Sequence, residues 1–300
     1  MAMPSPVPPI AAVRPYEVVS SNGTRLDEYH WLRDDTRTSK EVLAYLEAEN
    51  AYKASMTAHT RALEDRVYGE IIARIKQDDS SVPYRKRGYW YYTRFETGKE
   101  YPVYARKAGN LEAAEQLMLN ANVLAEGHGF YQVGATAIAP NDRLLAYVED
   151  TIGRRQYRLR IKDLETGETL PDVIENVDPA IAWTADSASV LYVEKHPETL
   201  LGYRVRRHML GTDPASDPLI YEQDDESFYT EVKKTKDERY LLIVAESTVS
   251  TEVRYADAAD PALNFRVFLP RERDHEYHVD HLEGRWIIRT NWQAPNFRLM

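Results

Sequence analysis

The chain has 300 residues, of which 43% are hydrophobic and 29% charged, so it is globular and long enough for one large domain or two ordinary ones. Its 48 acidic and 38 basic residues give a net charge of −10, which argues against a general nucleic-acid-binding protein. It has no cysteine, which excludes disulfides, a thiol nucleophile and cysteine-based metal sites.

The proline-rich first 15 residues lack the apolar core of a secretory signal. No stretch approaches the roughly 18 consecutive apolar residues of a membrane span. We therefore expect a cytoplasmic protein with neither membrane nor nucleic acid among its partners. The sequon at Asn22 would carry a glycan only in a secreted protein.

An N-terminal segment with two helices comes first. Residues 17–19 and 24–26 predict a strand pair around an Asn22-Gly23 turn. Thr38 and Glu41 fit a capping box, which predicts a helix from there to about Ala58. The second helix carries an apolar stripe, and because a propeller's outer surface is polar, both helices are expected to dock on another domain. That stripe consists of Leu63, Val67, Ile71 and Ile75.

A polar run that ends in proline, residues 77–83, predicts the boundary between residues 1–76 and 77–300. Beyond it the sequence repeats. The clearest unit is 137–168, in which apolar residues alternate with polar ones between turns rich in Gly, Asp and Asn. Similar apolar strands begin at residues 89, 144, 190, 240 and 286.

A repeat of roughly 50 residues made of short strands predicts a β-propeller, because a single small sheet cannot bury both faces alone. We expect a mainly β fold of about four blades plus the start of a fifth. A connection with some helical character at 111–119 would follow blade one. The blades would span 84–108, 137–168, 181–221, 230–268 and 277 onward.

Sequence motifs for catalysis are missing. There is no G-x-S-x-G, G-x-x-x-x-G-K-[ST], G-x-G-x-x-G or H-E-x-x-H, so we predict no catalytic, cofactor-binding or metal-binding residue. His275 and His281 would share one face of a strand and His278 the other, which favours a turn between blades over a metal site. A catalytic His128 would need a nucleophile, and none is identifiable.

Arg154 and Arg155 lie in a predicted β-turn and are the candidate contact residues. They would bind another domain or a substrate carboxylate through bidentate hydrogen bonds, or they would simply form a solvated hairpin tip. The acidic run 222–226 would attract cationic peptides or form a solvated loop.

Several segments in order resemble the prolyl oligopeptidase family of serine peptidases, and its oligopeptidase B branch in particular. The resemblance runs from about Pro8 to the end. Its motifs are the segments 29–35, 45–50, 153–157, 163–167, 207–212, 250–254 and 275–277.

The resemblance implies a seven-bladed propeller paired with an α/β-hydrolase domain, on which the N-terminal helices would pack. In the family the propeller restricts access to the catalytic serine, and oligopeptidase B cleaves short peptides after Arg or Lys. The catalytic Ser, Asp and His lie in the hydrolase domain, so the resemblance places none of them in this chain.

We therefore expect the front part of a longer peptidase, inactive alone, whose substrates are short basic peptides. The alternative is a non-catalytic propeller fragment that acts as an interaction module. A metal-dependent propeller hydrolase is disfavoured, because no carboxylate, Asn or His recurs at one position of the repeat. With an open blade edge and two apolar helix faces, the isolated chain is expected to be poorly soluble or oligomeric.

Overall fold

The computed structural model describes residues 6–20 and 23–300. The chain divides into two compact units, Met1–Lys76 and Gln77–Met300. In the described part of the chain, no helix is both long and apolar enough to cross a membrane. Whether the first unit packs on a hydrolase domain stays a prediction.

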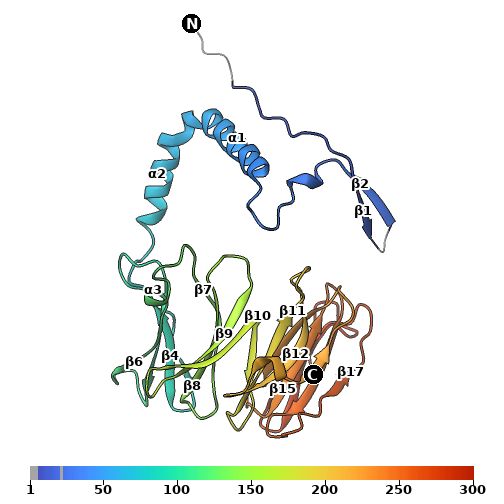
Figure 1. Cartoon of the computed structure of the whole chain (residues 1–300). Coiled ribbons are helices and arrows are strands. Elements are labelled where there is room, and N and C mark those ends of the chain that lie inside the picture. The colour runs from blue at the N-terminus through green and yellow to red at the C-terminus, as the bar shows by residue number, and fades with distance from the viewer. Residues whose placement is uncertain (1–5, 21–22) are drawn as a thin grey trace. The chain divides into compact units, whose positions relative to one another are not determined.

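The first unit begins with a two-stranded ribbon, β1 (Tyr16–Ser20) and β2 (Gly23–Asp27), which pair antiparallel as predicted. The predicted turn at Asn22 lies outside the described residues. Short 3-10 turns, η1 (His30–Leu32) and η2 (Ala58–Thr60), precede the helices α1 (Lys40–Met56) and α2 (Arg61–Ile72). Figure 1 shows these elements in blue.

The helix starts one residue later than the capping box predicted. Ser39, not Thr38, is the N-cap of α1, and its hydroxyl accepts a hydrogen bond from the backbone N–H of Val42 at 3.4 Å. Glu41 instead forms a bidentate ion pair with Arg14. The capping-box interpretation is therefore wrong, because a distant arginine binds the carboxylate more strongly than a backbone amide does.

The predicted apolar stripe of the second helix is exposed along its length. Leu63, Val67, Ile71 and Ile75 are each about half exposed, although Ile75 lies beyond the end of α2. The stripe thus has the exposure of a docking face without a partner.

The second unit consists of antiparallel sheets that follow one another in chain order (Figure 1). Blade one contains β3–β6, blade two β7–β10, blade three the end of β10 with β11–β13, blade four β14–β17 and blade five β18–β20. In blades one and two the bounds are β3 Tyr84–Lys86, β4 Tyr89–Arg94, β5 Val103–Ala108, β6 Glu115–Asn120, β7 Gln132–Ile138, β8 Leu144–Asp150, β9 Tyr157–Asp163 and β10 Thr169–Trp183. In the others they are β11 Ser189–Lys195, β12 Gly202–Met209, β13 Leu219–Glu222, β14 Tyr229–Lys234, β15 Tyr240–Glu246, β16 Thr251–Asp257, β17 Arg266–Leu269, β18 Tyr277–Leu282, β19 Arg285–Thr290 and β20 Arg298–Leu299. A further 3-10 turn, η3 (Pro214–Ser216), follows β12.

Strand β10 belongs to two blades. Its first part, up to Val177, pairs with β9, and Val177 and residues 181–183 pair with β11, with an irregularity between Val177 and Ile181. The bend lets one long strand leave the outer edge of blade two and enter blade three as its innermost strand. The two blades therefore form one seven-stranded sheet.

The connection after blade one is a strand where helical character was predicted. Residues 115–120 form β6, which pairs with β5, and only the short helix α3 (Ala121–Leu124) follows it. Met118 and Leu119 are buried in the contact with blade two, and this tertiary packing overrides the local helix propensity. Blade one thus extends to Asn120 rather than to Ala108.

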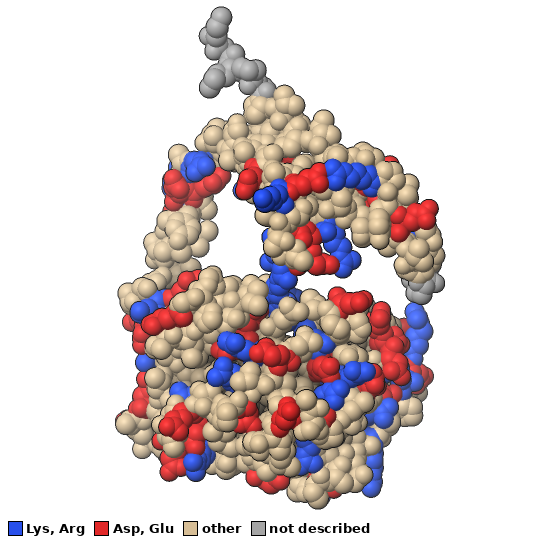
Figure 2. Space-filling view, viewed as in Figure 1, with Lys and Arg blue, Asp and Glu red and all other residues tan. Residues whose placement is uncertain are grey.

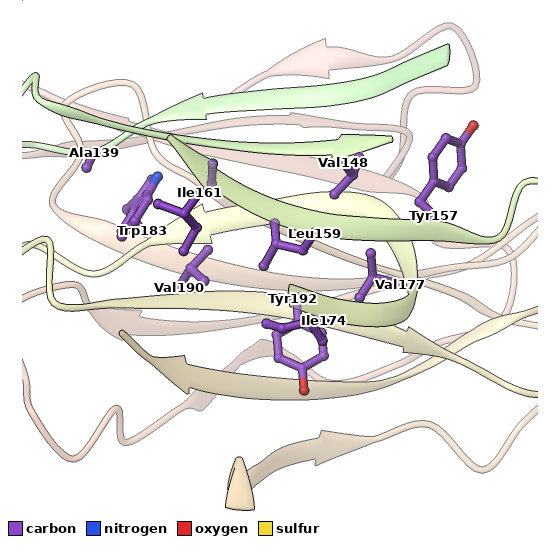
Figure 3. Close-up of a cluster of buried hydrophobic side chains, with 11 residues drawn as sticks. Ala139, Val148, Tyr157, Leu159, Ile161, Ile174, Val177, Trp183, Val190 and Tyr192 are labelled. Carbon is purple, nitrogen blue, oxygen red and sulfur yellow. The ribbon is translucent and has the colours of Figure 1, made fainter. Parts of the chain in front are cut away.

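The core lies between blades. On β8, Leu145 and Tyr147 pack with blade one, whereas Ala146 and Val148 pack with blade three. Period-two alternation therefore places apolar side chains on both faces of an inner strand. Figure 3 shows the cluster between blades two and three, in which Leu159 and Trp183 are fully buried.

Two further clusters join blade three to four and blade four to five. The mainly β propeller with four blades and the start of a fifth is confirmed. Blade five has three strands in this chain, and the sheets do not close into a ring among the described residues.

Candidate functional site

The propeller has two chemically distinct ends. Strands alternate in direction within each blade, so the turns between first and second strands gather at one end and the loops between second and third strands at the other. Hydrogen bonds between neighbouring blades agree with this arrangement. At the first end the amide of Asn141 donates to Ser187 (3.0 Å), and at the second Lys195 donates to the carbonyl of Arg155 (3.0 Å).

Charged side chains connect three turns at the first end. Arg87, in the β3–β4 turn, binds Asp142 of blade two (Nε to Oδ1, 2.9 Å) and Glu238 of blade four. Lys86 also binds Glu238, with 2.8 Å between Nζ and Oε1. We call Lys86, Arg87, Asp142 and Glu238 the turn network. It joins residues that are distant in sequence across the innermost part of the propeller.

Backbone conformation and burial hold the turn network in place. Arg87, Asp142 and Glu238 all have positive φ, of 46°, 56° and 62°, and their side chains are only about one-fifth exposed. Burial alone would raise the pKa of Glu238, but its hydrogen bonds to Arg87 and Lys86 keep that pKa below the ordinary value. The carboxylate is therefore ionised and paired at neutral pH.

A cavity of about 260 Å³ lies among the innermost strands of blades one to four. We call it the axial cavity. Its apolar wall includes Ile138, Ile181 and Trp183, and its polar wall includes Lys234 and Glu238. It thus adjoins the turn network through Glu238.

The predicted contact pair Arg154 and Arg155 lies at the other end, in the loop between β8 and β9. Buried Asp150 organises this loop by accepting hydrogen bonds from the amides of Ile152, Gly153 and Arg155 at 2.8–2.9 Å. Arg154 is half-buried and its Nε has no hydrogen-bond partner in the described structure, whereas Arg155 is exposed. The loop therefore presents two guanidinium groups from a fixed backbone.

The acidic run 222–226 lies at the same end and lines a cavity of about 210 Å³ with Tyr203 and Phe228. Two of its carboxylates have local partners. Glu222 pairs with Arg204 (2.8 Å), and Asp225 accepts from the hydroxyl of Ser227 (2.6 Å). These bonds suit a structured loop.

Of the histidines predicted to form a turn between blades, His275 lies in the segment before β18, but His278 and His281 lie on β18 itself, so the turn prediction is wrong for these two. His275 lies 3.0 Å from the hydroxyl of Thr290, and buried His281 lies 2.6 Å from Asp237. His278 lies on β18 with His281, and His128 is placed near Tyr131. In the part of the chain that the structure describes, no three His, Cys, Asp or Glu residues are arranged to hold a metal ion.

The turn network was missed at the sequence level, because its members come from three different turns. A signal did exist. A residue with positive φ lies two positions before the second strand of each of the five blades. It is charged in all of them except blade three, which has Ser187, and the turn network uses Arg87, Asp142 and Glu238. Elsewhere acidic and basic side chains are mixed over the face of this unit seen in Figure 2.

Comparison with known proteins supplies the context for these features. Residues 8–300 match the model of the prolyl oligopeptidase N-terminal β-propeller domain. The chain is 49% identical to dipeptidyl aminopeptidase BI of Pseudoxanthomonas mexicana, over 99% of this chain and 43% of that protein. It is 30% identical to protease 2 of Moraxella lacunata, over 97% of this chain and 43% of that protein.

Solved structures agree. Oligopeptidase B from Leishmania major superposes with a TM-score of 0.89 at 30% identity, over 98% of this chain and 44% of that one. Oligopeptidase B from Trypanosoma brucei, with covalently bound antipain, gives 0.88 at 28% identity over the same shares of the two chains. The chain thus spans less than half the length of the relatives it matches.

Proposed function

We propose a function from one premise: this chain belongs to the prolyl oligopeptidase family and forms its N-terminal β-propeller part. Its role would be to select substrates by size for a serine peptidase. The catalytic serine would lie in an α/β-hydrolase domain, and the propeller would limit which peptides reach it. The chain alone is expected to be inactive, because the catalytic residues would lie in the hydrolase domain. A cytoplasmic location remains part of this proposal.

The turn network carries the size-selection proposal. It links blades one, two and four at the end of the propeller where the first turns gather. Ion pairs between separate turns restrict how far those turns can move apart, and they place charged groups in the path of any chain entering there. A folded protein is therefore excluded, whereas a short extended peptide would need only local rearrangement.

For the bond cleaved, we propose the peptide bond after Arg or Lys in short basic peptides, as the resemblance to oligopeptidase B implies. The 49% identity to a protein named dipeptidyl aminopeptidase favours a second candidate, the release of dipeptides from a free N-terminus. Fluorogenic peptides that carry Arg at the cleaved bond, with free or blocked N-termini, separate the two activities. Arg154 and Arg155 are proposed to contact the hydrolase domain or the substrate.

The size-selection test bridges the turn network covalently. These 300 residues have no native cysteine, so Arg87→Cys with Glu238→Cys supplies the only two thiols of the propeller part. In the enzyme that carries this propeller, a short bis-maleimide bridge should lower kcat/KM for longer peptides far more than for a dipeptide derivative. The single variants treated with the same reagent are the control. Equal rates before and after bridging, at every peptide length, would overturn size selection at this end.

The alternative function is an interaction module. It predicts that the 300-residue chain is a compact, stable monomer until a partner binds, whereas the peptidase proposal predicts oligomers through the half-exposed stripe of α2. Size-exclusion chromatography distinguishes them. The intact mass of the protein in its source cells should be measured first. A species well above 34.6 kDa would mean that the assays should use the longer protein.

A further inference from the structure

Lys234 is the one ammonium group of the axial cavity that the described structure leaves buried without a hydrogen-bond partner. Lys86 of the same cavity is bonded to Glu238, which Arg87 also binds. The carboxylate that lines this cavity, Glu238, is therefore already shared by two other cations. A buried charge without a partner is costly, so the site favours an anion that can supply one.

The charged groups around Lys234 have an excess of one positive charge, which one more negative group would neutralise. Lys86, Arg87, Lys233 and Lys234 contribute four positive charges, and Asp142, Asp186 and Glu238 contribute three negative ones. Burial, followed by repulsion from Lys86 and Arg87, lowers the pKa of Lys234 to about 8, against the attraction of Glu238 and Asp186. An added anion would reverse this destabilisation of the charged form.

The rest of the cavity indicates which anion. The wall around Lys234 combines polar groups with apolar side chains, among them Ile138, Ile181 and Trp183. At about 260 Å³ the cavity is slightly smaller than the usual range for small-molecule sites, roughly 300–1,000 Å³. Such a site fits a single carboxylate on an apolar group better than it fits inorganic phosphate, which is usually bound by several donors.

We propose that the axial cavity binds the C-terminal carboxylate of a peptide whose last residue is apolar, with Lys234 as its ion-pair partner. The choice of a peptide rests on the proposed function. The binding itself requires no catalysis. A peptide entering the propeller would then be held by its C-terminus on the inner wall, on blade four.

The test measures binding of N-acetylleucine, N-acetylleucinamide and inorganic phosphate to the 300-residue chain by calorimetry. N-acetylleucine should bind at least tenfold more tightly than the other two, and Lys234→Met should weaken its binding at least tenfold. Lys236→Met, which removes an exposed charge from the neighbouring turn, is the matched control and should bind normally. Lys234→Met should also raise Tm, because it removes an unpaired buried charge, and this confirms that the variant folds.

A site-resolved measurement completes the test. In protein labelled with ¹³C-lysine, the Lys234 side-chain signal is the one missing from the Lys234→Met spectrum, and it should shift with N-acetylleucine but not with the amide. Equal affinity for acid and amide, or unchanged affinity in Lys234→Met, would overturn the proposal. Phosphate binding as tightly as N-acetylleucine would also overturn the peptide assignment. None of these results depends on peptidase activity or size selection, so the two proposals can fail separately.

Discussion

Asp172 and Asp217 bind opposite nitrogens of one buried imidazole. His208 lies 2.9 Å from Asp172 through Nε2 and 3.0 Å from Asp217 through Nδ1, and all three side chains are buried. Tyr192 donates to Asp217 and the amide of Gly211 to Asp172, at 3.0 and 2.6 Å. The contacts connect β10 in blade two with β12 and the loop after η3 in blade three.

Removing the imidazole should weaken the junction between blades two and three. His208→Gln would leave two buried carboxylates with too few donors, and we expect a loss of about 3–5 kcal/mol in the free energy of unfolding. Urea unfolding followed by tryptophan fluorescence measures it. His278→Gln, at a half-buried position on β18, is the control and should cost less than about 1 kcal/mol. Equal losses in the two variants would contradict the role assigned to His208.

The same cluster should contribute to acid sensitivity. Burial alone would raise the pKa of Asp172, but the Gly211 amide and His208 hold it below the ordinary value. A carboxyl group whose pKa is lower in the folded state stabilises the fold above its unfolded pKa of about 4, and this contribution disappears as the pH falls through the folded pKa.

Asp172→Asn tests this sign. At pH 7 the variant should be less stable than the parent, and below about pH 4 its stability should fall less steeply, by up to about 1.4 kcal/mol per pH unit. Urea unfolding between pH 3 and 7 gives both slopes. Parallel slopes would show that Asp172 is not a source of the acid sensitivity.

Two glycines should respond to alanine in opposite directions. A Cβ at Gly134 would lie 2.6 Å from the Tyr157 ring and 3.1 Å from Cβ of Pro179, so Gly134→Ala should cost about 1–3 kcal/mol. A Cβ at Gly69, within α2, meets nothing within 4 Å, and Gly69→Ala should stabilise the helix by up to about 1 kcal/mol. Thermal unfolding of both variants checks the prediction, and a Tm that rises in both would refute the packing argument at Gly134.

The repeat made the propeller predictable, whereas the contacts between turns were not. The unbroken apolar runs in β8 and β11 record burial on both faces directly in the sequence, because each face packs on a different blade. At β6 the local pattern was misleading, since its pairing with β5 and the burial of Met118 are tertiary effects. The partners of Arg87 depend on how blades one and four approach each other, which one-dimensional spacing does not encode.

The corrected N-cap of α1 gives a local test. Ser39→Ala should remove the hydroxyl that accepts from Val42 and destabilise the first turn by about 1 kcal/mol. Hydrogen exchange at the amide of Val42 should then become about fivefold faster, the equivalent of that energy. Thr38→Ala should leave the exchange unchanged, because the Thr38 hydroxyl interacts with Thr36. Faster exchange in Thr38→Ala, with unchanged exchange in Ser39→Ala, would instead support the capping box of Thr38 and Glu41.

Arg87 and Glu238 should be energetically coupled across the propeller. Arg87→Met leaves Asp142 and Glu238 with fewer cationic partners, and Glu238→Gln leaves Lys86 and Arg87 in excess, so each change alone should destabilise the fold. The double variant should be more stable than the sum of the two predicts, with a coupling energy of about 0.5–3 kcal/mol. Urea unfolding of the parent, the two single variants and the double variant gives this coupling energy. An Arg85→Met and Glu238→Gln cycle is the control, because Arg85 is exposed, and it should show almost no coupling. A coupling of zero between Arg87 and Glu238 would mean that blades one and four are not joined in solution at this end.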